Sequence, residues 1–189
     1  MALAKYKLVE LLECSEDRNE DLSFGVDDVR GISIQKMFIP TKADMADVSL
    51  RPYWQVKPND FSYVTVTSRN SEKITIAFND TDSTYIVSSS YIVFRVRRTD
   101  ILFPEYLFMF FNRPEFDRYA RFHSWGSARE TFDWSEMCDV EIELPPIEIQ
   151  RRYAEIVTAL NNFKGFRSKM ADFCPILIKG SLVEGAMCD

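Results

Sequence analysis

The stretch YIVFRV, Tyr91–Val96, is followed shortly by FPEYLFMFF, Phe103–Phe111, and the hydrophobic period changes between the two. The first stretch is rich in β-branched and aromatic residues at a period of two, which is typical of a strand. In the second, Pro104 suits the first turn of a helix, and apolar side chains then recur at helical spacing. A strand followed by a helix predicts a domain of the α/β class.

Further segments towards both ends of the chain show the same alternation of strand-forming residues. They are Gly31–Ile34, Tyr63–Thr67, Ile74–Phe78, Tyr85–Val87 and Val140–Leu144. The spacing of Leu8, Leu11 and Leu12 suggests a short helix, and a second helix is predicted over residues 115–122. Residues 124–131 have no periodicity and are predicted to form a loop.

The longest helical pattern follows Pro145-Pro146. Its apolar residues recur at intervals of 4, 3, 4 and 3, at Ile149, Tyr153, Ile156, Leu160 and Phe163. This heptad seam fits two interpretations: a surface for a coiled coil with another helix, or an ordinary amphipathic helix packed on its own domain. We therefore divide the chain into an α/β domain, residues 1–145, and a helical region, residues 146–189, which also contains a short apolar helix at residues 176–183.

The composition is that of a folded globular protein. Hydrophobic residues make up 46% of the 189 residues and charged residues 28%, which argues against disorder. No run approaches the roughly 20 apolar residues that a membrane span needs, and residues 1–10 lack the pattern of a secretory signal. We expect a cytoplasmic protein without a membrane partner.

The net charge is −6, yet basic residues are unevenly distributed along the chain. Residues 91–129 carry seven arginines against four acidic residues. Arginine suits bidentate contacts with phosphates and with guanine edges. The set fits either a nucleic-acid surface or solvated groups paired with neighbouring acids. Its members are Arg95, Arg97, Arg98, Arg113, Arg118, Arg121 and Arg129.

The residues that carry catalytic chemistry do not form a known constellation. His123 is the only histidine, and it lies in an aromatic stretch where packing is its commoner role. The sequence contains neither a glycine-rich phosphate loop nor an adenine-methylation motif of the Asn-Pro-Pro-Tyr type. We expect no catalysis, no cofactor and no metal, because the four cysteines are too widely spaced for a zinc site. They are Cys14, Cys138, Cys174 and Cys188.

Several motifs occur in a particular order along the chain. They are Val29–Ser33, Lys57–Phe61 (KPNDF), Ile86–Phe94, Phe103–Leu107, Gly126–Arg129 and Leu144–Gln150 (LPPIEIQ). In this order and spacing the chain resembles, over essentially its whole length, the target-recognition domain of type I restriction–modification specificity subunits. The Pro-Pro-x-x-x-Gln string that runs into a long helix is its most distinctive part. The resemblance implies a mixed, antiparallel-rich β domain with short helices and a long helical appendage.

The resemblance also implies a DNA reader that is not itself a catalyst. A full-length specificity subunit of this family has two recognition domains separated and followed by long helices, and each domain reads one half of a split DNA sequence. The helices dock adenine-N6 methyltransferase subunits, which bind S-adenosylmethionine, and restriction subunits complete the nuclease. This sequence holds one recognition domain and one helical region. It fits a natural half-subunit that homodimerises, a fragment, or a truncated gene product.

The length of the predicted helix agrees with this interpretation. A helix over residues 147–169 would be ~35 Å long, close to the ~34 Å of one turn of B-DNA. Two-fold pairing along the heptad seam would then let a homodimer read a palindromic, interrupted site. The alternative is an orphan or regulatory DNA-binding or assembly protein of the same fold that acts without the methyltransferase.

The residues expected to face double-stranded DNA lie in the predicted loop, at strand ends and on the second helix. They are Arg69, Lys73, Arg118, Arg121, Ser127, Arg129 and Thr131. Arg129 would reach a guanine edge or a phosphate, or it would instead form a salt bridge with Glu130 or Asp133. Phosphate contacts are the role expected of Arg118 and Arg121.

Overall fold

The computed structural model of the protein describes residues 3–41, 43–67, 73–127, 129–161 and 163. The chain divides into a first compact unit, Met1–Arg151, and a second that begins at Arg152. The domain boundary expected after residue 145 stays a prediction. None of the described helices is long and apolar enough to cross a membrane.

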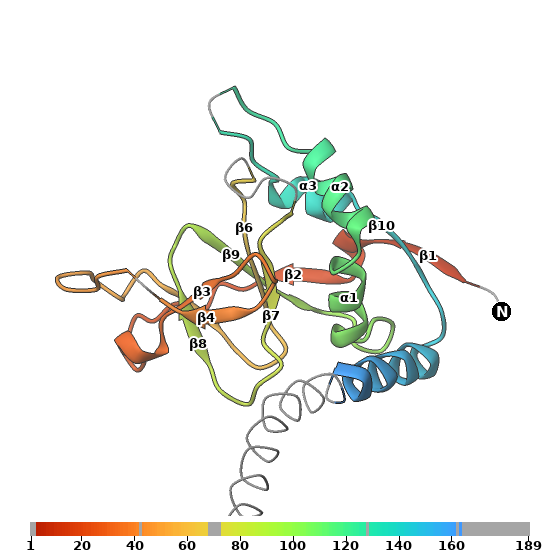
Figure 1. Ribbon diagram of the computed structural model, residues 1–189, viewed down its shortest axis with the longest axis horizontal. Helices are drawn as coiled ribbons and strands as arrows, with labels where there is room; N and C mark the ends of the chain where they lie inside the picture. The colour runs from red at the N-terminus through yellow and green to blue at the C-terminus, as the bar shows by residue number, and fades with distance from the viewer. Residues whose placement is uncertain (1–2, 42, 68–72, 128, 162, 164–189) are drawn as a thin grey trace, which may run out of the picture. The chain divides into compact units, whose positions relative to one another are not determined.

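A four-stranded antiparallel sheet with the order β2-β9-β6-β7 lies at the centre of the first unit (Figure 1). Strand β9, Tyr91–Val96, pairs with β2, Leu12–Cys14, on one side and with β6, Phe61–Val64, on the other. Strand β7, Ile76–Phe78, completes the sheet beside β6. The stretch YIVFRV therefore forms a strand, as its alternation predicts, and the structure places this strand inside the sheet.

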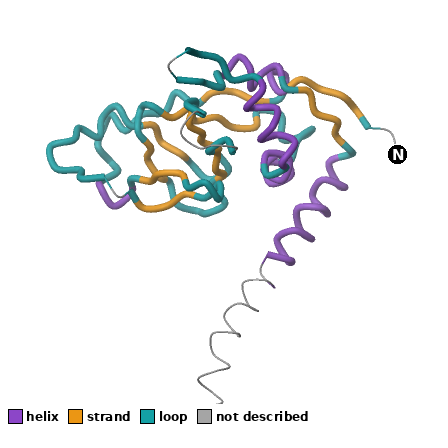
Figure 2. The backbone as a smooth tube through the Cα atoms, turned by 45° about the horizontal axis from the view of Figure 1, so that its top comes forward, coloured by secondary structure: helices purple, strands orange, loops and turns teal. Residues whose placement is uncertain are grey.

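Three two-stranded antiparallel sheets surround the central one, and short strands joined by long loops make up much of the first unit (Figure 2). Their strand pairs are β1, Ala4–Lys7, with β10, Glu141–Leu144; β3, Arg30–Ile32, with β4, Phe38–Pro40; and β5, Trp54–Val56, with β8, Tyr85–Val87. Every pairing between named strands of the described chain is antiparallel, so the predicted antiparallel-rich α+β fold is confirmed.

The helices follow β9 along the chain. They are α1, Pro104–Phe111, α2, Pro114–Phe122, and α3, Trp134–Asp139, and two 3-10 turns, η1, Leu8–Glu10, and η2, Val26–Asp28, precede them. Both α1 and α2 begin with proline at the first helical position, where its missing N–H costs nothing. A further helix covers residues 147–161, and residue 163 is also helical.

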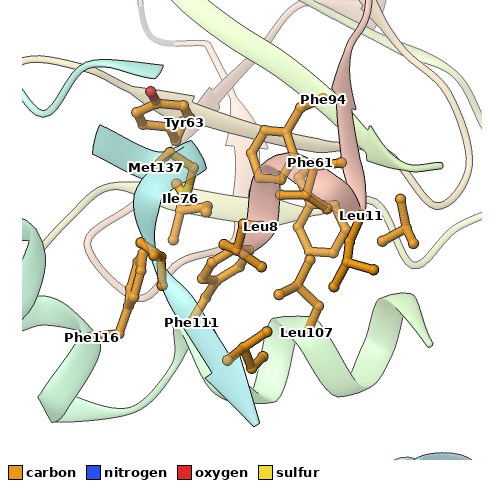
Figure 3. Close-up of a cluster of buried hydrophobic side chains, with 14 of the residues drawn as sticks. Leu8, Leu11, Phe61, Tyr63, Ile76, Phe94, Leu107, Phe111, Phe116 and Met137 are labelled. Atoms are coloured by element: carbon orange, nitrogen blue, oxygen red, sulfur yellow. The ribbon is translucent and has the colours of Figure 1, made fainter. Parts of the chain in front are cut away.

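Aromatic side chains join the sheet to the helices in one core. The rings of Phe61 and Phe94 stack at 5.1 Å between centroids, and Phe111 of α1 meets both edge-on at 5.8 and 6.1 Å. Figure 3 shows these rings together with Leu8 and Phe116, which enter the core from η1 and α2. The core thus fixes α1 and α2 against the sheet.

The N-terminal prediction was wrong in its details. Leu8, Leu11 and Leu12 do not form an α-helix. They extend from the 3-10 turn η1 to the start of β2. All three are nevertheless buried, so the pattern reported burial correctly. Helix α3 was not predicted, and the helical expectations for residues 164–169 and 176–183 lie outside the described residues.

Candidate nucleic-acid interface

Helix α2 presents two arginines to solvent. The side chains of Arg118 and Arg121 are 72% and 48% exposed. Arg118 lies 3.4 Å from Glu115, and Arg121 lies 3.8 Å from Glu130. Ion pairs this exposed contribute little to stability, so both guanidinium groups can exchange these partners for a phosphate.

A buried ion pair holds α2 in place. Lys36, which has a φ of 61° in the turn between β3 and β4, donates to Asp117 of α2 at 2.7 Å and to the carbonyl of Phe111. The same carboxylate oxygen accepts the N–H of Ile74 at 3.2 Å. Burial lowers the pKa of Lys36, and the hydrogen bond from Lys36 to Asp117 opposes that shift. The Lys36–Asp117 pair therefore links the β3–β4 turn to α2 and to Ile74, the residue that follows Lys73.

A pocket of about 600 Å³ lies at the exposed side of this arrangement. It is lined by Lys73, Asn112, Pro114, Asp117, Arg118, Arg121 and Phe122. Three of the predicted DNA-binding residues, Lys73, Arg118 and Arg121, are thus brought together although they come from two separate segments. Because Asp117 is neutralised by Lys36, the wall of the pocket carries the positive charge that a phosphate requires.

The loop after α2 is a narrow hairpin that projects from the body of the first unit (Figure 1). The N–H of Trp125 donates to the carbonyl of Thr131 at 3.0 Å, and the N–H of Thr131 donates back to the carbonyl of Trp125 at 2.9 Å. The N–H of Thr67 donates to the carbonyl of Glu130 at 2.9 Å, which ties the loop to the segment after β6. The base of the predicted loop is therefore closed by backbone hydrogen bonds and attached to the segment after β6.

Glycine is required at the turn of this hairpin. Gly126 has a φ of 135°, a conformation that residues with a side chain rarely adopt. A Cβ atom at this position would lie 2.2 Å from the carbonyl oxygen of Arg129. The close approach of the two backbones thus defines the loop from which Arg129 projects.

Arg129 is exposed, and the salt bridge considered for it is not formed. Neither Glu130 nor Asp133 lies within ion-pair distance of Arg129, and no other described residue does. Glu130 is instead the partner of Arg121. Arg129 therefore carries a positive charge on the projecting loop, and no acidic group of the described residues lies within ion-pair distance of it.

The remaining predicted residues divide by position. Ser127 is exposed on the same loop, whereas Thr131 is half-buried and its hydroxyl donates to the carbonyl of Trp125 at 3.5 Å. Thr131 thus helps to close the loop. Arg69 lies outside the described residues. Lys73, four residues later in the chain, is exposed.

Other arginines of residues 91–129 serve the fold. Arg95 on β9 donates to Asp17 at 2.8 Å and is two-thirds buried. Arg98 makes a bidentate pair with Asp100 at 2.9 and 2.8 Å. Neighbouring acids therefore account for these two, and the DNA-binding interpretation concentrates on α2 and the loop.

The family can now be assigned. The type I restriction modification DNA specificity domain matches residues 41–166, which include β5 to β10, α1 to α3 and the loop that bears Arg129. The chain belongs to this family. Membership confirms the predicted resemblance and the prediction of a specificity module rather than an enzyme.

Solved structures show the same fold. The specificity domain resembles the HsdS subunit from Thermoanaerobacter tengcongensis with a TM-score of 0.62 and 19% identity, over 96% of this chain and 49% of that one. A chain from a study of complex assembly and conformational transition of the type I R-M system gives 0.61 and 19%, with the same coverage. The type I S subunit from M. genitalium gives 0.53 and 10%, over 86% of this chain and 40% of that one.

This specificity domain thus spans about half the length of the first two solved chains. A search of the curated proteins found no match.

The structure explains the Pro-Pro-x-x-x-Gln string. Gln150 is fully buried, and its side-chain oxygen accepts the N–H of Phe103, the residue before α1, at 2.9 Å. Its amide group donates to the carbonyls of Ile101 and Pro145, both at 2.8 Å. One side chain thus joins the start of α1 to the end of β10.

The KPNDF motif forms the turn that leads into β6. Asn59 has a φ of 67°, and the Asp60 carboxylate accepts the N–H of Lys57 at 3.0 Å. The backbone of Asn79 bonds to both Asn59 and Asp60 at 2.9 Å, which closes the turn against the end of β7. This motif therefore has a structural role in the sheet.

His123 ends α2 in a structural environment. Its ring stacks on Tyr119 at 4.2 Å, and its Nδ1 atom lies 3.1 Å from Glu136. Cys14 and Cys138 are free thiols, and burial raises the pKa of both. Within the described ranges, no group of three or more His, Cys, Asp or Glu residues could hold a metal ion.

The heptad seam continues into the second unit. Ile149 is half-buried in the first unit, and four seam residues of the second unit are exposed: Tyr153 by 51%, Ile156 by 56%, Leu160 by 54% and Phe163 by 68%. Both interpretations of the seam stay open.

Sequence reasoning missed three residues of the interface. Lys36 and Asp117 lie far apart in the chain, and no local pattern signals their pairing. Phe122 has the residue type of a core position, and only its 74% exposure shows that it lies on the surface.

Proposed function

We propose that this chain reads one half of a split DNA sequence for a type I restriction–modification enzyme and has no catalytic activity of its own. One observation carries the proposal: a DNA specificity domain gathers Lys73, Arg118 and Arg121 at one pocket, and the loop that bears Arg129 is closed by backbone hydrogen bonds next to it. Phosphate contacts position a protein on DNA, and base contacts specify the sequence. The surface offers groups for both tasks.

The basic residues have different roles in this proposal. Arg118 and Arg121 hold the sugar–phosphate backbone, because their weak ion pairs with Glu115 and Glu130 are easily exchanged. Arg129 projects on a loop of defined shape and reads a guanine edge in the major groove. Ser127 and Lys73 add contacts around the same surface, and Arg69, which lies outside the described residues, is expected from the sequence to contact DNA as well.

Partner subunits supply the rest of the activity. The chain has a net charge of −6, so it contributes little of the general attraction to DNA that comes from neutralising phosphates. We assign that attraction and the S-adenosylmethionine site to an adenine-N6 methyltransferase subunit docked on the helical region, residues 146–189. Restriction subunits would complete the nuclease. The second half-site would be read by a second copy, paired along the seam.

The test is methylation of DNA by the assembled complex. The chain is mixed with the modification subunit encoded beside it and with DNA of random sequence, and N6-methyladenine is mapped. We expect methylation at one interrupted sequence. Sequence-specific binding without methylation would favour the orphan or regulatory alternative. If neither sequence-dependent methylation nor sequence-dependent binding occurs, the proposed function is wrong.

Substitution of Arg129 tests the assignment of the loop. Arg129→Ala should weaken binding to the recognised sequence by about 5- to 100-fold, the value of one bidentate base contact, and should leave binding to unrelated DNA nearly unchanged. Arg98→Ala is a matched control, since Arg98 is also exposed but is paired with Asp100. Unchanged specific binding by Arg129→Ala would refute the base-reading role.

A further inference from the structure

Two large aromatic side chains on the proposed DNA-facing surface are exposed. Phe122 is 74% exposed and Trp125 is 61% exposed, and no large hydrophobic side chain of the described chain is more exposed than Phe122. The remaining phenylalanines of α2 and the adjoining segment, Phe116 and Phe132, are buried. Two exposed aromatic side chains three residues apart in the chain, at the end of α2 and the start of the loop, are candidates for a contact site.

Both rings are carried by backbone that hydrogen bonds hold in place. Phe122 lies in the last turn of α2, which the Lys36–Asp117 pair anchors to the β3–β4 turn. Trp125 has both of its backbone polar groups bonded to Thr131. A side chain that separates stacked bases needs such a mount, because a flexible one would fold back and not transmit force.

The charges around the rings indicate the nature of the partner. Phe122 lines the same pocket as Lys73, Arg118 and Arg121, and Arg129 follows Trp125 on the loop. A protein surface that matched the rings alone would not require this set of cations. Double-stranded DNA offers phosphates for the cations and the flat apolar faces of its bases for the rings.

We propose that Phe122 and Trp125 enter the DNA at a base step of the half-site and part adjacent base pairs while the arginines hold the flanking phosphates. The inference rests on the proposed function and adds a means of specificity to it. Pyrimidine–purine steps unstack and kink most easily, so a protein that parts a step favours sequences that carry one there. The chain thus reads part of its target through deformability, and the recognised half-site contains such a step.

The experiment uses the chain assembled with its modification subunit and a duplex of the sequence that the complex selects from a random pool. The fluorescent base 2-aminopurine replaces a base at each step of the half-site in turn, since its emission rises when it is unstacked. We expect emission to rise at a pyrimidine–purine step. Phe122→Ala and Trp125→Ala should abolish the rise and weaken binding by about 5- to 100-fold, the value of one base–aromatic stack.

Three further variants separate the effect of the aromatic rings from effects on folding and on charge. Ile34→Ala removes an apolar side chain that is 57% exposed in the β3–β4 turn, and it should leave both signals unchanged. Arg118→Ala should weaken binding and still give the full emission once the duplex is saturated. Trp125→Phe should keep most of the signal, since it retains an aromatic ring.

The outcomes are distinguishable. If a sequence is selected but no step brightens, the inference is wrong and the proposed function stands. If the alanine variants bind and unstack DNA normally but lose the modification subunit, the rings are a protein-docking surface and the inference is again wrong. If the pool yields no preferred sequence, the proposed function fails, and the inference fails with it.

Discussion

Asp60 is a carboxylate in an almost fully buried position, 3% exposed, at the turn before β6. Burial raises its pKa from 3.8 to about 6, although the N–H of Lys57 and the charges of Arg95 and Lys57 oppose this shift. The folded protein therefore binds this proton more tightly than the unfolded chain does. The stability that Asp60 contributes is complete below about pH 4 and is lost as the pH rises through about 6.

Asp60→Asn keeps the oxygen that accepts the Lys57 N–H and removes the titration. We expect the free energy of unfolding of the wild-type protein, relative to the variant, to fall between pH 4 and pH 7 in a series of urea titrations. Asp17→Asn is the contrast, because hydrogen bonds from Arg95 and Lys57 lower the pKa of Asp17 to about 2. Its contribution is present above pH 4 and is lost as the pH falls towards 2. Parallel curves for wild type and Asp60→Asn would contradict the assignment.

Gln150 is the residue whose loss should cost the fold most for its size. Gln150→Ala would leave the buried N–H of Phe103 and the carbonyls of Ile101 and Pro145 without their partner. A buried polar group that is left unpaired costs about 1–3 kcal/mol. We therefore expect urea titrations to show a decrease of about 2–4 kcal/mol in the free energy of unfolding. Glu148→Ala, at an exposed position of the same helix, is the control. A loss of less than about 1 kcal/mol would show that water replaces the amide.

At the scale of single residues, the sequence shows which residues matter more readily than it shows which groups they contact. The Pro-Pro-x-x-x-Gln string is visible as a motif, yet the groups that Gln150 bonds lie on segments up to 49 residues away. Arg95 and Arg129 belong to one arginine-rich region, but Asp17 engages the first from the far end of the chain. Periodicity and spacing contain no information on such contacts, because the folded sheet alone creates them.

The hairpin loop 124–131 is the element on which base reading depends. Gly126→Ala would add a Cβ atom whose ideal position lies 2.2 Å from the carbonyl oxygen of Arg129. The backbone φ of 135° at this residue is also one that alanine rarely adopts. The loop must then open, and Arg129 must move. We expect specific DNA binding to fall at least tenfold, with the core of the sheet and the thermal transition nearly unchanged, because the loop projects from the body.

Gly25→Ala is the matched control for this element. Gly25 has no other atom within 4 Å of an added Cβ, so the same substitution should be tolerated there. Equal specific binding by the wild-type and Gly126→Ala proteins would show that the loop shape does not matter for reading. The two variants are compared by fluorescence anisotropy with the selected duplex and by thermal denaturation.

Elements with a clear hydrophobic period were predicted, among them the three-residue strand β8, whereas α3 and β5 were not. Strand β9 and helix α1 have clear periods of two and 3.6 residues, and both occur where expected. Helix α3 has six residues and β5 has three, and neither stands out in the sequence by its period. The stretch Leu8–Leu12 has leucines at helical spacing, but it connects two strands of separate sheets. Strand β1 ends just before Leu8 and pairs with β10, and β2 begins at Leu12 and pairs with β9. Tertiary pairing therefore overrides the local pattern.

At the scale of the whole molecule, the chain spans about half of the length of the first two solved chains that it resembles, and we propose that it reads half of a DNA site. A split DNA site needs two readers at a fixed spacing, and the exposed seam of the second unit is the surface on which a second copy would supply the other. Apolar side chains at the a and d positions of a heptad repeat are unfavourable when exposed to water, unless a partner helix covers them. The sequence predicts this seam, but it cannot name the partner, since a coiled coil and a packed helix share the same pattern.

Leu160→Glu tests the seam. Leu160 is 54% exposed, so the folded monomer should tolerate the change, while a charge at the centre of a paired helix should abolish a dimer. Light scattering of the full-length chain should give twice the monomer mass for wild type and the monomer mass for the variant. Thr158→Glu adds the same charge to an exposed position off the seam, and it should leave the dimer intact. If wild type is monomeric alone and Leu160→Glu instead loses the modification subunit, the seam binds that subunit, and a second half-site reader must come from elsewhere.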